Sequence, residues 1–144
     1  MFAVAKNLAL RTLALPVASG GAAFENTSTV AYDDLPPDLP AACTEPAEVV
    51  GGSFAMHRTG PGPASGVRLN YAARITLALA WDDDGSEESA EDADAGLERA
   101  VAVLAQQGFT VDRALMYQYD WGDRPVWFAA LALRLPCQIT YPAP

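Results

Sequence analysis

Residues 114–139, ALMYQYDWGDRPVWFAALALRLPCQI, decide the fold that this sequence predicts. Two apolar, aromatic-rich runs, 114–119 and 126–135, flank the polar segment Asp120–Pro125. The glycine and proline of that segment supply the backbone angles that a chain reversal needs, so the stretch is typical of an antiparallel β-hairpin. Pro136 has no N–H to donate to a sheet ladder, and it therefore predicts a sheet edge. No residue in the hairpin indicates a catalytic group.

The length and composition of the chain predict one globular domain covering residues 1–144. The 144 residues are 51% hydrophobic, and their mean hydropathy is +0.08. The sequence has no apolar run of about 18 residues that could span a bilayer. The N-terminal segment partly resembles a secretion signal, but Lys6 and Arg11 fall within the part that is uncharged in such signals, so export is not expected.

The charge balance is strongly acidic, with 18 acidic and 9 basic residues and a formal net charge of −9. Phosphate backbones and anionic lipids repel such a chain, so the composition argues against nucleic-acid and membrane binding. Cys43 and Cys137 have the spacing of neither a metal site nor a disulfide framework. We expect both to be small buried residues in the reduced state, with a bridge between them only in an oxidising compartment.

The first half of the chain predicts one helix and several short strands. Residues 2–15 have apolar side chains at near-helical spacing. Short β-type runs follow at Thr27–Tyr32 and Pro46–Val50, and a bulge or an end at the next two glycines precedes a continuation to Met56. Between the two runs, Asp33–Pro40 has three prolines in eight residues, which predicts an extended or turning loop.

The second half predicts a long strand and a helix before the hairpin. The strand is residues 67–81, where alternating side chains predict one buried face. Gly60–Gly66, just before it, is expected to be the tip of a mobile arm that becomes ordered on contact with a neighbouring subunit. Ser86 or Ser89 is expected to cap the helix, and Gly108 to end it.

Eight of the 18 acidic residues lie between Asp82 and Asp94. The first turn of a helix favours negative charge, so the run is expected to be the solvated start of that helix. Asp82–Gly85 also resembles the start of a calcium loop, but the glycine and glutamate do not fall at the positions that such a loop needs. We therefore predict no metal ion and no cofactor. The alternative is a small metal-dependent enzyme or binding module that uses Asp82–Asp94.

The other candidates for chemistry have equally plain explanations. His57 is the only histidine, and no nucleophile or metal ligand clusters with it in the sequence. The glycine-rich segments lack the lysine and the helix start of a phosphate-binding loop. The hairpin aromatics could stack on nucleic-acid bases, but only Arg113 and Arg124 lie near them, so a sheet core or a subunit interface fits better. No catalytic residue is predicted.

The order of these elements resembles the tail terminator (tail-completion) proteins of long-tailed bacteriophages and related particles. The resembling features are an N-terminal helix, the segment Val30–Pro40 leading to Pro46–Val50, and a long strand. A helix at Ser89–Gln107 follows, and the closing hairpin has an aromatic turn before an apolar strand. The layout matches over nearly the whole chain. Neck, head-completion and tail-tube proteins of the same particle have a similar layout.

The resemblance implies an α+β protomer with a mostly antiparallel sheet, an N-terminal helix and one central helix packed on it. It implies a non-enzymatic virion protein that is assembled in the cytoplasm of a bacterial host. Its partners would be further copies in a ring, commonly a hexamer, together with the tail tube protein and the head–tail connector. DNA would pass through the ring without specific binding, which fits the acidic charge. The residues expected to form contacts between subunits are Pro61, Gly62, Pro63, Tyr117, Tyr119, Trp121 and Trp127. A monomeric binding protein is the remaining alternative.

Overall fold

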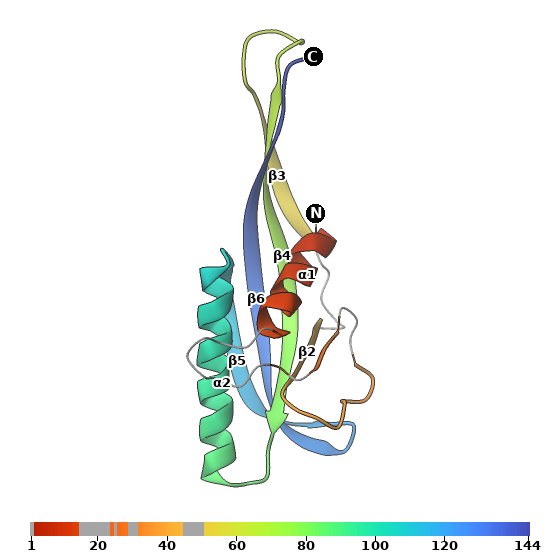
Figure 1. The fold of residues 1–144 in the computed structure, drawn as a ribbon, viewed down its shortest axis with the longest axis vertical. Coiled ribbons are helices and arrows are strands. Elements are labelled where there is room, and N and C mark those ends of the chain that lie inside the picture. The colour runs from red at the N-terminus through yellow and green to blue at the C-terminus, as the bar shows by residue number, and fades with distance from the viewer. Residues whose placement is uncertain (1, 15–23, 25, 29–31, 45–50) are drawn as a thin grey trace.

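The computed structural model describes residues 2–14, 24, 26–28, 32–44 and 51–144, which form a six-stranded sheet with two helices on one face (Figure 1). The strands lie in the order β1-β2-β4-β6-β5, and β3 pairs with the part of β4 that β2 leaves open. β1 is parallel to β2, and the other described pairs are antiparallel, so the predicted α+β fold is confirmed. The elements are α1 (Phe2–Ala14), β1 (Asn26–Ser28), β2 (Ala41–Thr44), β3 (Gly51–Arg58), β4 (Val67–Asp82), α2 (Glu87–Gln106), β5 (Thr110–Trp121) and β6 (Arg124–Tyr141).

Strand β4 organises the sheet because every other strand except β1 and β5 pairs with it. It pairs with β6 along its whole length, from Val67 opposite Tyr141 to Asp82 opposite Val126. On its other edge, β3 pairs with residues 67–74 and β2 with residues 77–80.

The strands are longer than the helices that cover them. The 16 residues of β4 span about 53 Å, whereas the 20 residues of α2 span about 30 Å. The uncovered part of β3, β4 and β6 forms an arm, residues 51–74 and 135–141, which rises at the top of Figure 1. Pairing between β5 and β6 stops at Arg134, so along the arm β6 has no other neighbour among the described residues. Pro136 lies at this open edge, as predicted.

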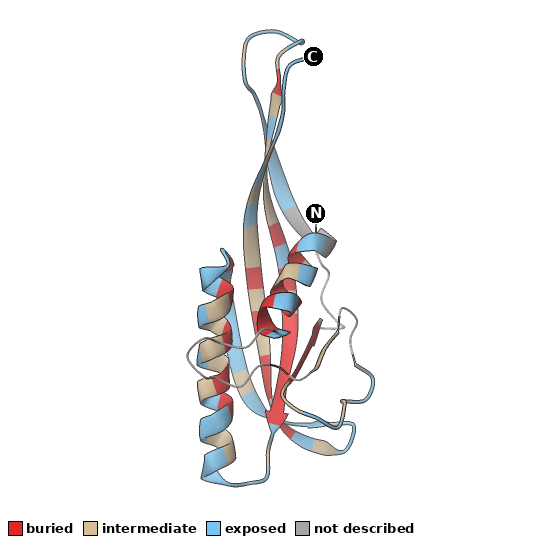
Figure 2. Cartoon of the chain, in the orientation of Figure 1, coloured by how far each residue is buried: buried red, intermediate tan, exposed pale blue. Residues whose placement is uncertain are grey.

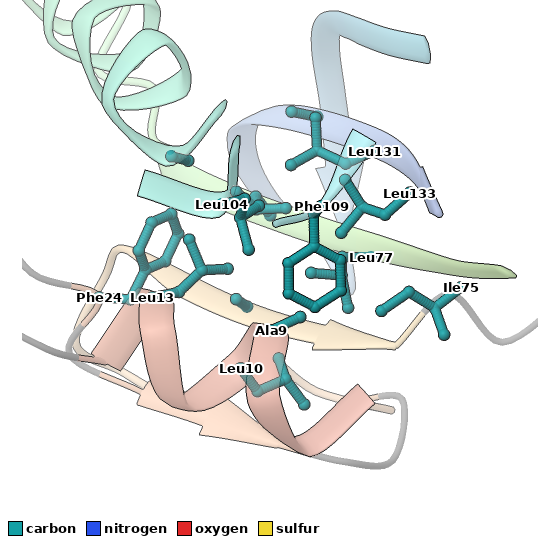
Figure 3. Packing of buried hydrophobic residues seen from close by; sticks show 14 of the residues in the cluster. Ala9, Leu10, Leu13, Phe24, Ile75, Leu77, Leu104, Phe109, Leu131 and Leu133 are labelled. Carbon is teal, nitrogen blue, oxygen red and sulfur yellow. The ribbon is translucent and has the colours of Figure 1, made fainter. Parts of the chain in front are cut away.

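The main core lies between the helices and the sheet (Figure 3). Leu77 and Leu131 of the central strands and Leu104 of α2 are fully buried. Replacing a leucine of this kind by alanine typically costs about 2–5 kcal/mol. The labelled residues of Figure 3 are Ala9, Leu10, Leu13, Phe24, Ile75, Leu77, Leu104, Phe109, Leu131 and Leu133.

A smaller core lies on the opposite face of the sheet. Cys43, Ala78 and Phe128 are buried there, and partly buried side chains of the segment 32–40 pack over them. The guanidinium of Arg124 holds this segment by donating to the carbonyl oxygens of two consecutive prolines at 2.8 and 3.0 Å. The prediction of one buried face for the long strand is therefore wrong for its inner half, where both faces are covered. Figure 2 shows that half of β4 as buried and the arm as mostly intermediate or exposed.

Helix α2 begins and ends as its sequence predicts. The Ser86 hydroxyl oxygen accepts a hydrogen bond from the Ser89 N–H at 3.1 Å, so Ser86 is the N-cap. Gly108 follows the helix with a positive φ of 98°, which glycine adopts without strain. The buried face of the helix consists of Ala93, Gly96, Ala100 and Leu104.

The C-terminal hairpin is confirmed, and its turn is shorter than predicted. Gly122 and Asp123 both have positive φ, 56° and 67°. Two such residues form the type of turn whose twist matches that of the flanking strands. The ladder therefore extends to Trp121 opposite Arg124.

The N-terminal strands differ from the sequence prediction. A strand was expected at Thr27–Tyr32, and the structure has β1 at Asn26–Ser28 instead. Tyr32 is not part of a strand, and residues 29–31 are not among the described residues. Strand β2 was not predicted, since four small, weakly apolar residues after a proline-rich segment give no alternating pattern. The expected strand Pro46–Val50 also lies outside the described residues.

Gly96 allows α2 to approach the sheet, and this gives a test of the core. A Cβ at this position would lie 2.5 Å from Nε1 of the buried Trp81. We expect Gly96→Ala to lower the free energy of unfolding by about 1–2 kcal/mol, because overpacking outweighs the better helix propensity of alanine. Urea unfolding measures this. In a Trp81→Phe background the same substitution should cost less, and an equal cost in both backgrounds would contradict the close contact.

The two cysteines cannot form a bridge within one chain. Cys43 of β2 lies opposite Ala78 of β4, and Cys137 of β6 lies opposite Tyr71 of β4. Ala78 and Tyr71 are about 23 Å apart along the strand. A disulfide needs Cα atoms within about 7 Å. Thiol counting under denaturing, non-reducing conditions should therefore find two thiols in the monomeric chain. An intrachain disulfide in peptide mapping would contradict the register of β2 and β6.

Candidate functional site

The face of the hairpin that points away from the helices bears an exposed group of large side chains. This aromatic face consists of the exposed side chains of Leu115, Tyr117 and Tyr119 and of half-buried Trp121, which surround buried Phe128. The rings of Tyr117 and Tyr119 lie 5.2 and 5.5 Å from that of Phe128, and the Trp121 ring lies 5.7 Å from it. Leu115, Tyr117 and Tyr119 remain 43%, 47% and 48% exposed.

The predicted contact residues do not form one surface. Successive residues of a strand point to opposite faces, so Trp127 lies with the helix-side core while Tyr117, Tyr119 and Trp121 lie on the aromatic face. Pro61–Pro63 lie at the exposed tip of the β3–β4 hairpin, which closes with a 3.0 Å hydrogen bond from the Thr59 N–H to the Gly66 carbonyl oxygen. The seven residues therefore lie in three places: three on the aromatic face, three at the hairpin tip and Trp127 on the helix side.

The arm bears a second exposed apolar surface, which the sequence analysis did not identify. Phe54 is 66% and Met56 53% exposed, and they lie opposite Tyr71 and Leu69 of β4. The rings of Phe54 and Tyr71 are 5.7 Å apart. We call this surface the arm face. Its residues lie on the same face of the sheet as the β4 residues that pack under the helices, but beyond the part that the helices cover. The sequence feature that could have predicted this surface is the alternation of large apolar with small or polar side chains in residues 53–57 and 67–75.

The acidic run is divided between two sides of α2. Asp84, Glu88 and Asp92 line a cleft of about 520 Å³ with Phe24, Trp81, Arg99 and other residues. A second stripe is exposed along the helix, with residues at i, i+4, i+7 and i+11. It consists of Glu87, Glu91, Asp94 and Glu98. Seven of the eight acidic residues are exposed and Asp83 is half-buried, so the run is solvated as expected and is divided between two sides of the helix.

The carboxylates at the start of α2 are engaged in local hydrogen bonds. Asp84 accepts from the hydroxyl and the N–H of Ser86, and Asp83 accepts from the Gly85 N–H at 3.0 Å and from Gln118 at 3.1 Å. The Ser86 hydroxyl bond, followed by the Ser86 backbone bond, holds the pKa of Asp84 below its ordinary value. Asp84 is therefore charged at neutral pH and is not suited to donate a proton. The start of the helix accounts for these contacts without a ligand.

Between α2 and β5 lies a shallower cleft of about 310 Å³. Ala90, Glu91 and Asp94 of the helix line one side, and Met116 and Trp127 of the hairpin line the other. The indole N–H of Trp127 is buried and has no acceptor among the described residues. A buried donor without an acceptor is costly and uncommon. The cleft itself combines the apolar side chains of Met116 and Trp127 with the negative charge of Glu91 and Asp94.

The cations nearest to the aromatic face are partly used in ion pairs. Arg124 contacts Asp82 at 2.9 Å, and at the other end of β5 Arg134 contacts Asp112 at 2.7 Å. Arg113, opposite Ala132 and one position along the face from Leu115, is exposed and is the cation beside the aromatic face that no ion pair among the described residues engages. The bond to Arg134 lowers the pKa of Asp112, so this pair stays charged near neutral pH. Phosphate binding beside the aromatic rings would have to compete with these carboxylates, which disfavours a nucleic-acid platform.

Within the described ranges, no three His, Cys, Asp or Glu side chains are grouped so that they could hold a metal ion. His57 is exposed on the arm, opposite Arg68. Neither described helix is long and apolar enough to cross a membrane. No protein-family model and no curated protein sequence matches this chain.

The start of α2 gives a test that separates a capped helix from a metal site. Replacing Asp83, Glu87 and Glu88 by their amides should change the free energy of unfolding by less than about 1 kcal/mol, because exposed charges at a helix start contribute little and repel one another. Calcium or magnesium should not raise the melting temperature of the wild-type protein. Ser86→Ala is the control, with a loss of about 1 kcal/mol. A metal-dependent rise that the triple amide variant loses would instead identify a metal site.

Proposed function

We propose that this protein is a non-enzymatic ring subunit of a phage-type tail, acting as the tail terminator that caps the tail tube and joins it to the head connector. The single observation that supports this best is the presence of two exposed apolar surfaces, the arm face and the aromatic face, on one small protomer. Large exposed side chains such as Phe54 at 66% and Tyr119 at 48% are typical of surfaces that assembly covers.

The open strand edges support the same proposal. Within the described residues, β3 and β5 each have one edge without a strand partner. Such edges invite pairing with another chain, and a closed ring removes them. The two edges lie on opposite sides of the sheet, so they suit a head-to-tail contact in which each subunit has two neighbours. The stoichiometry that we propose, a hexamer, comes from the family resemblance.

The acidic charge supports a passage for DNA. A negatively charged ring repels phosphate and avoids the salt-dependent binding of a basic channel. We therefore propose that DNA passes without specific binding, that the tail tube protein and the connector are the direct partners, and that the protein resides in the virion after assembly in the bacterial cytoplasm. The separation of Cys43 and Cys137 along β4 agrees with the reduced cysteines expected in that compartment.

A second candidate function uses the 520 Å³ cleft at the start of α2. Asp84, Glu88, Asp92 and Arg99 all line this cleft, and the Nε of Arg99 is buried without an acceptor among the described residues. A small anionic or metal-bound ligand would suit this mixture of charges. We favour the structural role because the capping contacts already engage Asp84.

The ring proposal has a direct test in the assembly state. Native mass spectrometry and electron microscopy of the 15.2 kDa chain, alone and with purified tail tubes, should show a homo-oligomeric ring, six-fold on tube ends. Capping should stop tube growth, because the open end of the tube is then covered. Self-polymerisation into long tubes would instead indicate a tube protein, and binding to the connector alone a neck protein. A chain that stays monomeric with tail tubes would contradict all three.

A further inference from the structure

The arm differs in charge from the rest of the chain. The arm, residues 51–74 and 135–141, contains Arg58, Arg68 and Arg74 but no Asp or Glu, and residues 142–144 add no charged side chain. All 18 acidic residues therefore lie outside the arm. The arm is a basic surface with exposed apolar side chains, attached to a strongly acidic body.

A matching surface lies on the side of α2 that faces β5. The exposed carboxylates of Glu87, Glu91, Asp94 and Glu98 follow one stripe of the helix. Glu91 and Asp94 also line the 310 Å³ cleft, beside the apolar side chains of Met116 and Trp127. This cleft is large enough for one or two apolar side chains. Its carboxylates complement the positive charge of the arm, and its apolar walls complement the apolar side chains of the arm face.

The strand directions agree with a contact between these two surfaces. β3 is antiparallel to β4, β4 to β6, and β6 to β5, so β3 and β5 run in opposite directions at opposite edges of the sheet. Phe54 lies level with Tyr71 of β4, and Met116 lies level with Leu79, eight residues or about 26 Å farther along the strand. Two copies in the same orientation, shifted by that distance along the strands, can therefore join β3 to β5 as an antiparallel ladder with both helix faces on one side. Phe54 and Met56 then lie on the α2 side, where the cleft is.

We propose that the arm of one copy docks on a second copy, with strand β3 adding to the open edge of β5. Phe54 and Met56 enter the cleft between α2 and β5, and Arg58 lies next to the carboxylate stripe. This inference rests on the self-association that the proposed function requires, and it specifies the surfaces that meet. Each copy has one arm and one acceptor, so the contact is head-to-tail.

The test uses variants on the two sides of the contact, with sedimentation velocity as the readout. Phe54→Ser with Met56→Ser, and separately Glu91→Lys with Asp94→Lys, should each raise the concentration for half-assembly at least about tenfold. The substituted side chains are exposed, and circular dichroism checks that the fold is kept. The control for the arm is Ala55→Ser with His57→Ser, on the opposite face of β3. The control for the acceptor is Glu88→Lys with Asp92→Lys, on the other side of α2. Both control variants should assemble like the wild type.

Mixing the two defective variants tests the direction of the contact. The intact arm of one variant should dock on the intact acceptor of the other, so the mixture should form a one-to-one heterodimer and nothing larger. Arg58→Glu should weaken assembly, and combining it in one chain with Glu91→Lys and Asp94→Lys should restore assembly. No heterodimer in the mixture, or assembly of the arm variant at wild-type concentrations, would overturn the proposal.

The outcomes also separate this inference from the proposed function. Rings that cap tail tubes with a defective arm would refute the docking mode and keep the terminator role. Arm-dependent self-assembly without binding to tail tubes would keep the docking mode and refute that role. A third outcome is that the wild-type chain never self-associates and that the arm variant loses binding to tail tubes. The tube protein would then be the partner of the arm, and self-docking would be overturned.

Discussion

The antiparallel ladder between β4 and β6 is the constraint on which the rest of the structure depends. All 16 residues of β4 have a partner on β6, so the ladder continues along the whole of β4. A ladder about 53 Å long cannot be covered by helices of 13 and 20 residues, which span about 20 and 30 Å. The chain therefore has a body in which the sheet is covered and an arm in which it is not. The same strand passes from fully buried Leu77 to half-buried Leu69 without a break.

The sequence predicted the elements whose signals are local. The C-terminal hairpin, the long strand and the capped helix each have a pattern within about 20 residues, and all three are confirmed. Strand β2 gave no such pattern, because its place is determined by pairing with residues 77–80, more than 30 positions away. The covered second face of β4 could not be predicted either, since it depends on Arg124 holding a proline-rich segment nearly 90 residues earlier in the chain.

The candidate surfaces were predictable only in part, for the same reason. The hairpin aromatics were identified, but their division between two faces follows from the register of β5 against β6. Phe54 and Met56 have the composition of an ordinary strand, and their exposure results from the difference in length between strands and helices. The cleft beside Trp127 joins residues from α2 and β6 that no sequence spacing connects. Local propensity predicts elements, whereas long-range pairing determines which of their side chains remain exposed.

The distribution of charge explains how a chain with open strand edges could avoid unwanted pairing. An edge such as that of β3 can in principle pair with the same edge of another copy. Two arms placed side by side would bring together like-charged arginines without any carboxylate, so this arrangement is disfavoured. Two acidic bodies repel each other for the same reason. The contact between copies that charge favours is that of the arm with the body, and in the docking that we propose this asymmetry would direct the pairing of strand edges.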